Sequence, residues 1–216
     1  GPAAAGRKLM RICFRFIIYL LVITAFSAAR ADSYVDFFRA VNVDNAGKVA
    51  ELLSKGFDPN TVDEKGQVAL YLAMREDCPK VAEVLLASPA LKVDAANAVG
   101  ETPLMMAAMM GRLDWTKKLI ERGAKVQKPG WSPVHYAATG PNTEVLALLL
   151  DRGADINARA PDMSTPLMMA VRFGPEESVK LLVRRGAETS YINERNLTAA
   201  DMARNLDKRW LEPLLK

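Results

Sequence analysis

Methionine is the residue type in this chain whose spacing most suggests chemistry. Pairs stand at Met105 and Met106, at Met109 and Met110, and at 168–169. Thioether sulfurs suit Cu(I), and exposed methionines are open to reversible oxidation. A methionine-based copper or redox buffer is therefore one functional class to weigh. Against it, Met109 and Met110 project about 100° apart if helical, so we predict no metal site and no cofactor.

The other reactive residue types are too sparse for a familiar active site. The chain has one histidine, His135, and two cysteines, Cys13 and Cys78. Of these, only His135 and Cys78 lie beyond residue 31, and one His and one Cys cannot build a tetrahedral zinc site of the usual kind. No phosphate loop, nucleophile elbow or H-E-x-x-H motif occurs, and the acidic residues are scattered over outward helix faces. We expect no enzymatic activity.

Basic charge is concentrated at the beginning of the chain. The net charge is +4, from 29 basic and 25 acidic residues. Residues 1–31 contain five of the basic residues and no acid, so residues 32–216 carry a net charge of −1. This balance gives no electrostatic reason to expect a nucleic acid partner.

Residues 1–31 have the pattern of a secretory signal peptide. A basic stretch at 7–15 precedes an apolar run of eleven residues at 16–26, and small residues at Ala29 and Ala31 fit a signal-peptidase site before Asp32. Residues 1–6 resemble a tag remnant. We expect export to the periplasm and no membrane contact after cleavage. An uncleaved helix would instead give a membrane-tethered scaffold, and a buried core helix is a third interpretation of the run.

The stretch 32–216 is built from a repeated phrase. "TPLMMA" occurs at 102–107 and at 165–170, with a degenerate copy, "SPVHYA", at 132–137. The leucine-like position recurs with spacings of 34, 30, 33 and 33 residues. Its members are Leu70, Leu104, Val134, Leu167 and Ala200.

Each repeat predicts two short helices. Thr or Ser followed by Pro suits a helix start, since the hydroxyl can cap a free N–H and Pro needs no donor there. A Leu-rich second helix follows a short break and ends at a glycine: Gly56, Gly123, Gly153 or Gly186. Helices of eight to ten residues are unstable alone. They must bury their faces on neighbouring units, as in a solenoid.

The repeat resembles the ankyrin repeat. "GETPLMMAA" at 100–108, "GWSPVHYAA" at 130–138 and "RGADINA" at 152–158 match that family's two motif halves. The resemblance implies an all-α ankyrin repeat solenoid over 32–216 with about five to six repeats including the caps. We expect a half-repeat at 33–60, four fuller repeats and a C-terminal cap at 196–206. The third period, of 30 residues, predicts a shortened hairpin at 126–131.

The resemblance also assigns roles to single residues. His135 occupies the motif histidine position and is expected to bond nearby backbone. Met105 and Met168 replace that histidine, and we expect its polar role to be lost there. Met106 and Met169 are expected to pack in the core. Trp131, in the shortened hairpin, is either an exposed anchor for a partner or packed under the neighbouring tip.

Ankyrin repeats present a concave surface made by the ends of first helices and by hairpin tips. By analogy, partner contacts are expected at the two residues after the Ala-Ala pair and at the tips. The predicted protein-binding residues are Arg75, Glu76, Met109, Met110, Trp131, Thr139, Asp162, Met163, Arg172 and Phe173.

The resulting expectation is a non-enzymatic protein–protein interaction module in the periplasm. It binds one partner protein of unknown identity and is itself a monomer. Two roles stay open: a toxin-neutralising immunity protein, and an accessory to a periplasmic stress-defence enzyme. The copper or redox buffer and the tethered scaffold are the alternatives.

Overall fold

The structure, a computed structural model, describes residues 30–216. Its regular elements are helices, and the described residues contain only one isolated antiparallel bridge, between Val62 and Val68. The all-α fold predicted from the repeats is therefore confirmed. The signal-peptide prediction covers residues 1–31 and lies outside the described part, apart from Arg30 and Ala31, which are helical. None of the described helices is both long and apolar enough to cross a membrane.

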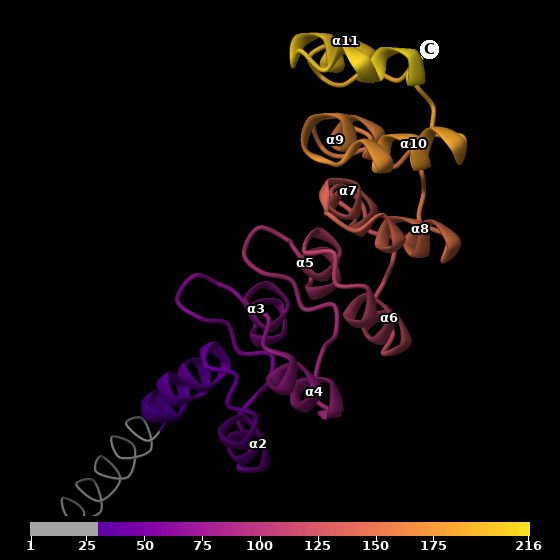
Figure 1. Ribbon diagram of the computed structural model, residues 1–216. Coiled ribbons are helices and arrows are strands. Elements are labelled where there is room, and N and C mark those ends of the chain that lie inside the picture. The colour runs from indigo at the N-terminus through magenta and orange to yellow at the C-terminus, as the bar shows by residue number, and fades with distance from the viewer. Residues whose placement is uncertain (1–29) are drawn as a thin grey trace, which may run out of the picture.

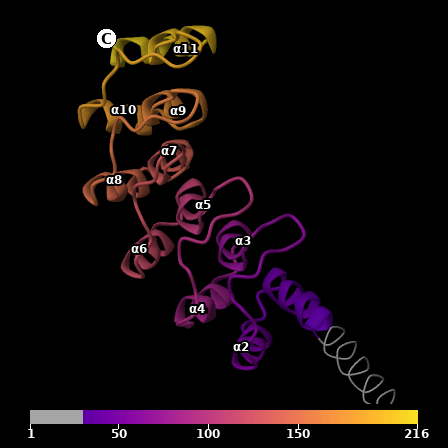
Figure 2. The same cartoon turned by 180° about the vertical axis from the view of Figure 1, so that it is seen from behind.

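Helix pairs stack in one direction and form a curved array (Figure 1). The first helices of the pairs line the inner side of the arc and the second helices its outer side, which the reverse view also shows (Figure 2). The pairs are α3 (Ala69–Glu76) with α4 (Pro79–Ala87), α5 (Pro103–Met109) with α6 (Leu113–Glu121), α7 (Pro133–Thr139) with α8 (Thr143–Asp151), and α9 (Pro166–Phe173) with α10 (Glu176–Arg184).

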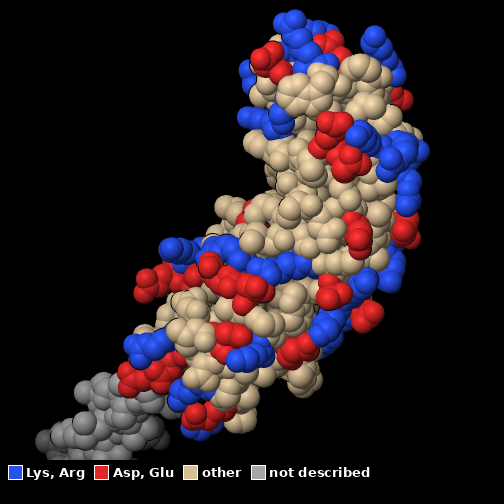
Figure 3. Space-filling model, in the orientation of Figure 1, with Lys and Arg blue, Asp and Glu red and all other residues tan. Residues whose placement is uncertain are grey.

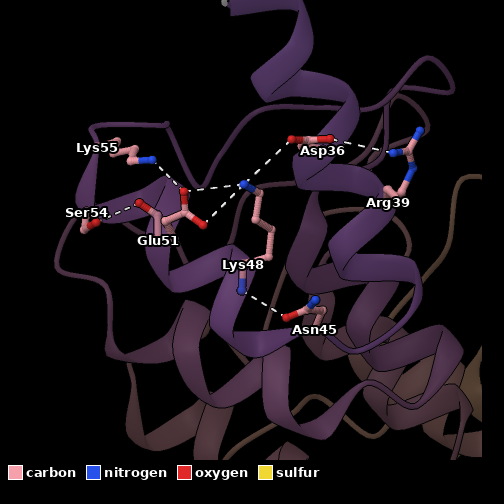
Figure 4. Close-up of polar contacts among 7 residues, drawn as sticks. All are labelled: Asp36, Arg39, Asn45, Lys48, Glu51, Ser54 and Lys55. Carbon is pink, nitrogen blue, oxygen red and sulfur yellow. Dashed lines mark hydrogen bonds and ion pairs between the residues drawn. The ribbon is translucent and has the colours of Figure 1, made fainter.

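The N-terminal unit has two helices, so the expected half-repeat is wrong. A helix over 30–42 precedes α2 (Ala46–Ser54). This first helix lacks the Thr-Pro phrase and was therefore hidden from the repeat pattern. Lys48 of α2 joins the two helices, with Nζ 3.8 Å from Asp36 Oδ2 and 3.3 Å from Glu51 Oε2 (Figure 4).

The glycine ends of the second helices and two of the first-helix starts follow the predicted chemistry. The hydroxyls of Thr102 and Thr165 accept the N–H of the residue three positions on, each at 3.3 Å. The Ser132 hydroxyl is buried without a partner, so the third copy of the phrase lacks this cap. The glycines after the second helices have φ between 85° and 98°, a region that favours glycine.

Neighbouring pairs form one continuous core. Leucines of successive repeats are fully buried between the helices, among them Leu104, Leu119, Leu149 and Leu167. The helices α2 to α11 have seven to nine residues. Elements of this length depend on the faces of their neighbours for stability.

Two glycines allow first helices to pack closely. A Cβ on Gly174, at the end of α9, would lie 2.1 Å from the Ala138 carbonyl oxygen of α7. A Cβ on Gly140 would lie 2.7 Å from the Ala108 carbonyl oxygen of α5. Both glycines have negative φ. Close approach of backbones, and not backbone conformation, therefore requires glycine at these positions.

The array closes at the C-terminus with a modified pair. Helix α11 (Ala199–Asn205) is followed by a 3-10 helix, η1 (Arg209–Leu214). Leu211 and Leu215 are buried against the preceding units. The predicted cap at 196–206 is thus present and continues beyond its expected end.

Candidate protein-binding groove

A hollow of about 600 Å³ lies on the inner side of the arc, across α5, α7 and α9. We call it the groove. Figure 3 shows few charged side chains on the inner edge of the arc beside α7, whereas charge is dense over the N-terminal repeats. The groove is lined by Met109, Trp131, His135, Tyr136, Thr139, Asp162, Met169, Arg172 and Phe173.

Six of the ten predicted binding residues lie in this lining. Met109, Thr139 and Phe173 are the last residues of α5, α7 and α9, and Arg172 precedes Phe173. Each of these first helices ends after about two turns, and its last side chains lie at the inner surface of the arc. Trp131 and Asp162 enter from the segments that precede α7 and α9.

The other four predicted residues lie outside the groove. Arg75 and Glu76 end α3, one repeat further toward the N-terminus, and form an ion pair of 2.6 Å with each other. Met110 follows α5, is 39% exposed and does not belong to the lining that its neighbour Met109 joins. Met163 is 46% exposed at a hairpin tip.

Three lining residues were not predicted as binding residues. His135, Tyr136 and Met169 sit at the motif histidine position or directly after it. Met169 is half-buried: it packs against the core, as expected, and also lines the groove, whereas Met106 is buried. The prediction took only the residues after the Ala-Ala pair and the hairpin tips. Including the inward-facing residues of the first helices would have found these three positions.

His135 has the structural role expected of it. Its Nδ1 accepts the N–H of Ser132 at 3.2 Å, and its Nε2 lies 3.0 Å from the Ala158 carbonyl oxygen. The ring is fully buried, and burial lowers the pKa of His135. A neutral ring that accepts at Nδ1 and donates at Nε2 satisfies both contacts. His135 therefore holds the floor of the groove in place.

Trp131 combines the two interpretations that the sequence left open. Its ring is half-buried and meets the His135 ring edge-on, with centroids 5.4 Å apart. It also lines the groove. The hydrogen bond that closes hairpins in other repeats, such as Ala160 N–H to the Ser164 carbonyl, has no counterpart at 126–131 among the described residues. The expected short hairpin brings Trp131 down onto the groove.

The methionines at the histidine position differ from expectation in one case. Met105 Sδ lies 3.4 Å from the backbone nitrogen of Thr102, where it accepts a weak hydrogen bond as His135 Nδ1 does from Ser132. The predicted loss of the polar role is therefore wrong at Met105. Sulfur is a weak acceptor, but it keeps the helix start paired. Met168 is buried, and its N–H is capped by Thr165.

A carboxylate fixes one wall of the groove. Glu101 accepts hydrogen bonds from the Tyr136 hydroxyl at 2.8 Å, from the Tyr71 hydroxyl at 2.7 Å and from Asn97 Nδ2 at 2.8 Å. Burial alone would raise the pKa of Glu101, but these three hydrogen bonds outweigh it and the pKa is lowered. The ring of Tyr136 is thus held by a charged, fully partnered acceptor.

The groove contains one cation and one anion. Both oxygens of Asp162 accept hydrogen bonds from Ser164, at 3.0 Å from its N–H and from its hydroxyl. Arg172 has no carboxylate within ion-pair distance among the described residues, and its guanidinium lies 4.8 Å from the centroid of the Phe173 ring. The guanidinium of Arg172, a hydrogen-bond donor, is therefore the charged group of the groove that is available to a partner.

Metal-binding residues do not gather in the described part of the chain. It contains no cluster of three or more His, Cys, Asp or Glu side chains that could hold a metal ion. Met109 and Met169 line the same groove, although they come from α5 and α9. Cys78 is buried between α3 and α4, and burial raises the pKa of its thiol, which disfavours the reactive thiolate.

Comparison with known proteins identifies the repeats. A sequence model of three ankyrin repeats matches residues 37–130 and again 125–193. The B-cell lymphoma 3 protein homolog of Mus musculus is 32% identical over 161 residues, 71% of this chain and 36% of that protein. Neurogenic locus notch homolog protein 4 of Homo sapiens is 36% identical over 115 residues, 51% of this chain and 6% of that protein. Protein glp-1 of Caenorhabditis elegans is 25% identical over 193 residues, 82% of this chain and 15% of that protein.

The chain spans about a third of the length of the first of these relatives and less of the other two. What the comparisons share with it is the repeat array. Ankyrin repeats are generally non-enzymatic scaffolds that bind protein partners, so the chain carries a protein–protein interaction module. By its repeats and by the helix pairs they form, the chain belongs to the ankyrin repeat family.

Proposed function

We propose that the chain binds one partner protein through the groove. The main support is a largely apolar hollow of about 600 Å³, whose lining includes Met109, Tyr136 and Phe173. Hydrogen bonds hold its floor in place. Phe173 is 58% exposed, and exposed aromatic and Met side chains are enriched in protein interfaces. Hollows of roughly 300–1,000 Å³ bury a ligand group well.

The fixed floor supports binding over a purely structural role. His135 and Tyr136 are held by hydrogen bonds to Ala158 and Glu101, so the groove is formed before a partner arrives. Preformed sites lose less conformational entropy on association. The apolar lining then gains the free energy of leaving water without first having to be ordered.

Site-specific cross-linking tests this function in the cell. A photo-reactive amino acid replaces Thr139 inside the groove or, as the control, Lys117 on the exposed outer face of α6. A partner that occupies the groove gives a covalent adduct from position 139 and none from position 117. Equal adducts from both positions, or none from position 139, would contradict the proposal.

The cellular setting is part of the same proposal. We infer export to the periplasm with cleavage before Asp32, binding as a monomer, and a role as an immunity protein or as an accessory to a stress-defence enzyme. The basic stretch, apolar run and small residues of 1–31 support the export and the cleavage. The mass of the native protein is the check: loss of residues 1–31 is expected, and retention would favour the tethered scaffold.

A further inference from the structure

Two repeats carry an arginine at the same place in the first helix, with different surroundings. Arg75 stands in α3 and Arg172 in α9, each five residues after the leucine of the repeated phrase. Arg75 Nε lies 2.6 Å from Glu76 Oε1, and its Nη1 donates to Gln67 Oε1 at 2.9 Å. Both acceptors come from its own repeat, so Arg75 is satisfied within the chain.

Arg172 has neither of those acceptors in its own repeat. Phe173 occupies the position of Glu76, and Ser164 occupies the position of Gln67. The Ser164 hydroxyl already donates to Asp162 Oδ2 at 3.0 Å. Arg172 is exposed, its guanidinium lies over the Phe173 ring, and it lines the groove without a carboxylate partner among the described residues.

A second cation lies behind Arg172. Lys208 Nζ donates to the carbonyl oxygens of Val171 at 2.9 Å and Arg172 at 3.2 Å, at the end of α9. No carboxylate of the described residues lies within ion-pair distance of Lys208. A ligand that complements this end of the groove therefore carries a negative charge beside the group that enters the apolar hollow.

We propose that the groove recognises a partner protein segment in which an Asp or Glu side chain pairs with Arg172 while an adjacent large apolar side chain enters the hollow. The inference rests on the proposed function and names the chemistry of its partner. An arginine fork suits a carboxylate because two parallel N–H···O bonds can form. The stacked Phe173 ring holds the guanidinium plane and limits the entropy lost on pairing.

The surroundings favour a side-chain carboxylate over other anions. The C-terminal ends of α5, α7 and α9 meet at the groove, and such ends present free carbonyls and not free N–H groups. Capture of a chain terminus uses backbone N–H nests, which helix C-termini do not provide. A nucleic acid needs several cations along its backbone, whereas the groove lining has one, together with the anion Asp162.

Selection from random peptides tests the inference on the full chain. Peptides are displayed as internal segments, without a free terminus, and selected on the wild type and on Arg172→Ala, Arg172→Glu and Arg75→Ala variants. We expect the wild type and Arg75→Ala to enrich Asp or Glu beside Phe, Leu, Ile or Met. Arg172→Ala should keep the apolar preference alone, and Arg172→Glu should shift the charge preference to Lys or Arg.

A double-mutant cycle on a selected peptide gives the quantitative readout. Changing its acid to Asn should weaken binding to the wild type at least about tenfold, the size of one charge-assisted pair. On Arg172→Ala the same change should cost less than about twofold, because the partner cation is already absent. A penalty that persists undiminished on Arg172→Ala overturns the inference.

The remaining outcomes separate the two proposals. Groove-dependent peptides without acid enrichment, lost on Met109→Lys, overturn the inference and leave the proposed function standing. If no selected peptide depends on Met109, the proposed function fails as well. Enrichment only in a library with free C-termini, or self-association of the chain that Met109→Lys abolishes, identifies a chain terminus or a second copy as the occupant and also overturns the inference.

Discussion

Tyr71 and Tyr136, on first helices two repeats apart, donate hydrogen bonds to the two oxygens of the same carboxylate. Glu101, from the repeat between them, accepts at 2.7 Å from Tyr71 and at 2.8 Å from Tyr136. The contact joins three repeats on the inner surface and fixes the Tyr136 wall of the groove. A solenoid otherwise depends on contacts between nearest neighbours, so this link adds coupling across a longer span.

Glu101→Ala should lower the free energy of unfolding by about 1–2 kcal/mol, because two tyrosine hydroxyls and an amide lose their acceptor at a half-buried site. Glu121→Ala, on the exposed face of α6, is the control and should change it by less than about 0.5 kcal/mol. Urea titration of both variants measures the difference. Equal effects would show that the three-repeat contact contributes nothing specific.

The stabilisation by Glu101 should also depend on pH. The pKa of Glu101 is lowered in the fold, so its contribution is present above the unfolded value of about 4.3 and is lost as the pH falls through the folded value. Burial and the Glu101 carboxylate raise the pKa of Tyr71 and Tyr136, so their contribution is complete below about 10 and is lost at higher pH. The gap between wild type and Glu101→Ala should therefore narrow at both extremes.

His135→Met gives α7 the residue that α5 and α9 have at the same position, Met105 and Met168. The Ala158 carbonyl then loses its donor, and we expect a loss of about 1–2 kcal/mol. His135 is the only histidine of the chain, and burial lowers its pKa. Wild-type stability should fall as the pH drops below about 6.5, where the unfolded histidine takes up a proton. The variant should lack this slope, and a slope of the same size in both would assign it elsewhere.

Gly174→Ala and Gly47→Ala form a matched pair. At Gly174 the added methyl group would meet the Ala138 carbonyl oxygen at 2.1 Å, so α7 and α9 must separate, and we expect a loss of about 2 kcal/mol or more. At Gly47, inside α2, the nearest atom is 3.6 Å away, and alanine should stabilise by about 0.5–1 kcal/mol through helix propensity. Thermal unfolding distinguishes the two, and loss of stability in both variants would contradict this packing account.

Met163→Gly should raise stability and leave binding nearly unchanged, because Met163 lies outside the groove lining. Met163 has φ of 66° at a hairpin position where three other repeats have Gly66, Gly100 and Gly130. A left-handed conformation costs a methionine about 1 kcal/mol, and the side chain is exposed beside Asp162 of the groove. Thermal unfolding and partner binding are measured for both proteins; an unchanged melting temperature would contradict the strain assigned to Met163, and a large loss of affinity would place binding outside the groove.

The repeat phrase predicted the helix pairs well because their chemistry is local. A Thr-Pro start, a leucine face and a terminal glycine each act within one repeat, and Thr102 and Gly123 behave as expected. The N-terminal unit was predicted as a half-repeat at 33–60 because its first helix, over 30–42, has no such phrase. The Glu101 contact was not predictable either. Glu101 bonds to Tyr71, 30 residues before it in the chain, and to Tyr136, 35 residues after it.

Positions in the groove could be predicted only in part. The family pattern indicates which residues end the first helices, and it therefore found Met109, Thr139 and Phe173. It does not indicate which repeats approach closely enough to share one hollow. Arg75 and Arg172 are equivalent in sequence position, yet only Arg172 reaches the groove, because the hollow lies across α5, α7 and α9.

The adjacent residues Met109 and Met110 provide the most direct test of the account. Met109 lines the groove, whereas Met110 is exposed outside it. Binding of the cross-linked partner, or of a selected peptide, is measured for Met109→Lys and Met110→Lys after circular dichroism confirms that both fold. We predict that Met109→Lys weakens binding by about 30-fold or more, as at an interface hot spot, and that Met110→Lys changes it by less than about threefold. Equal losses in the two variants, or none in Met109→Lys, would contradict the claim that the groove is the binding site.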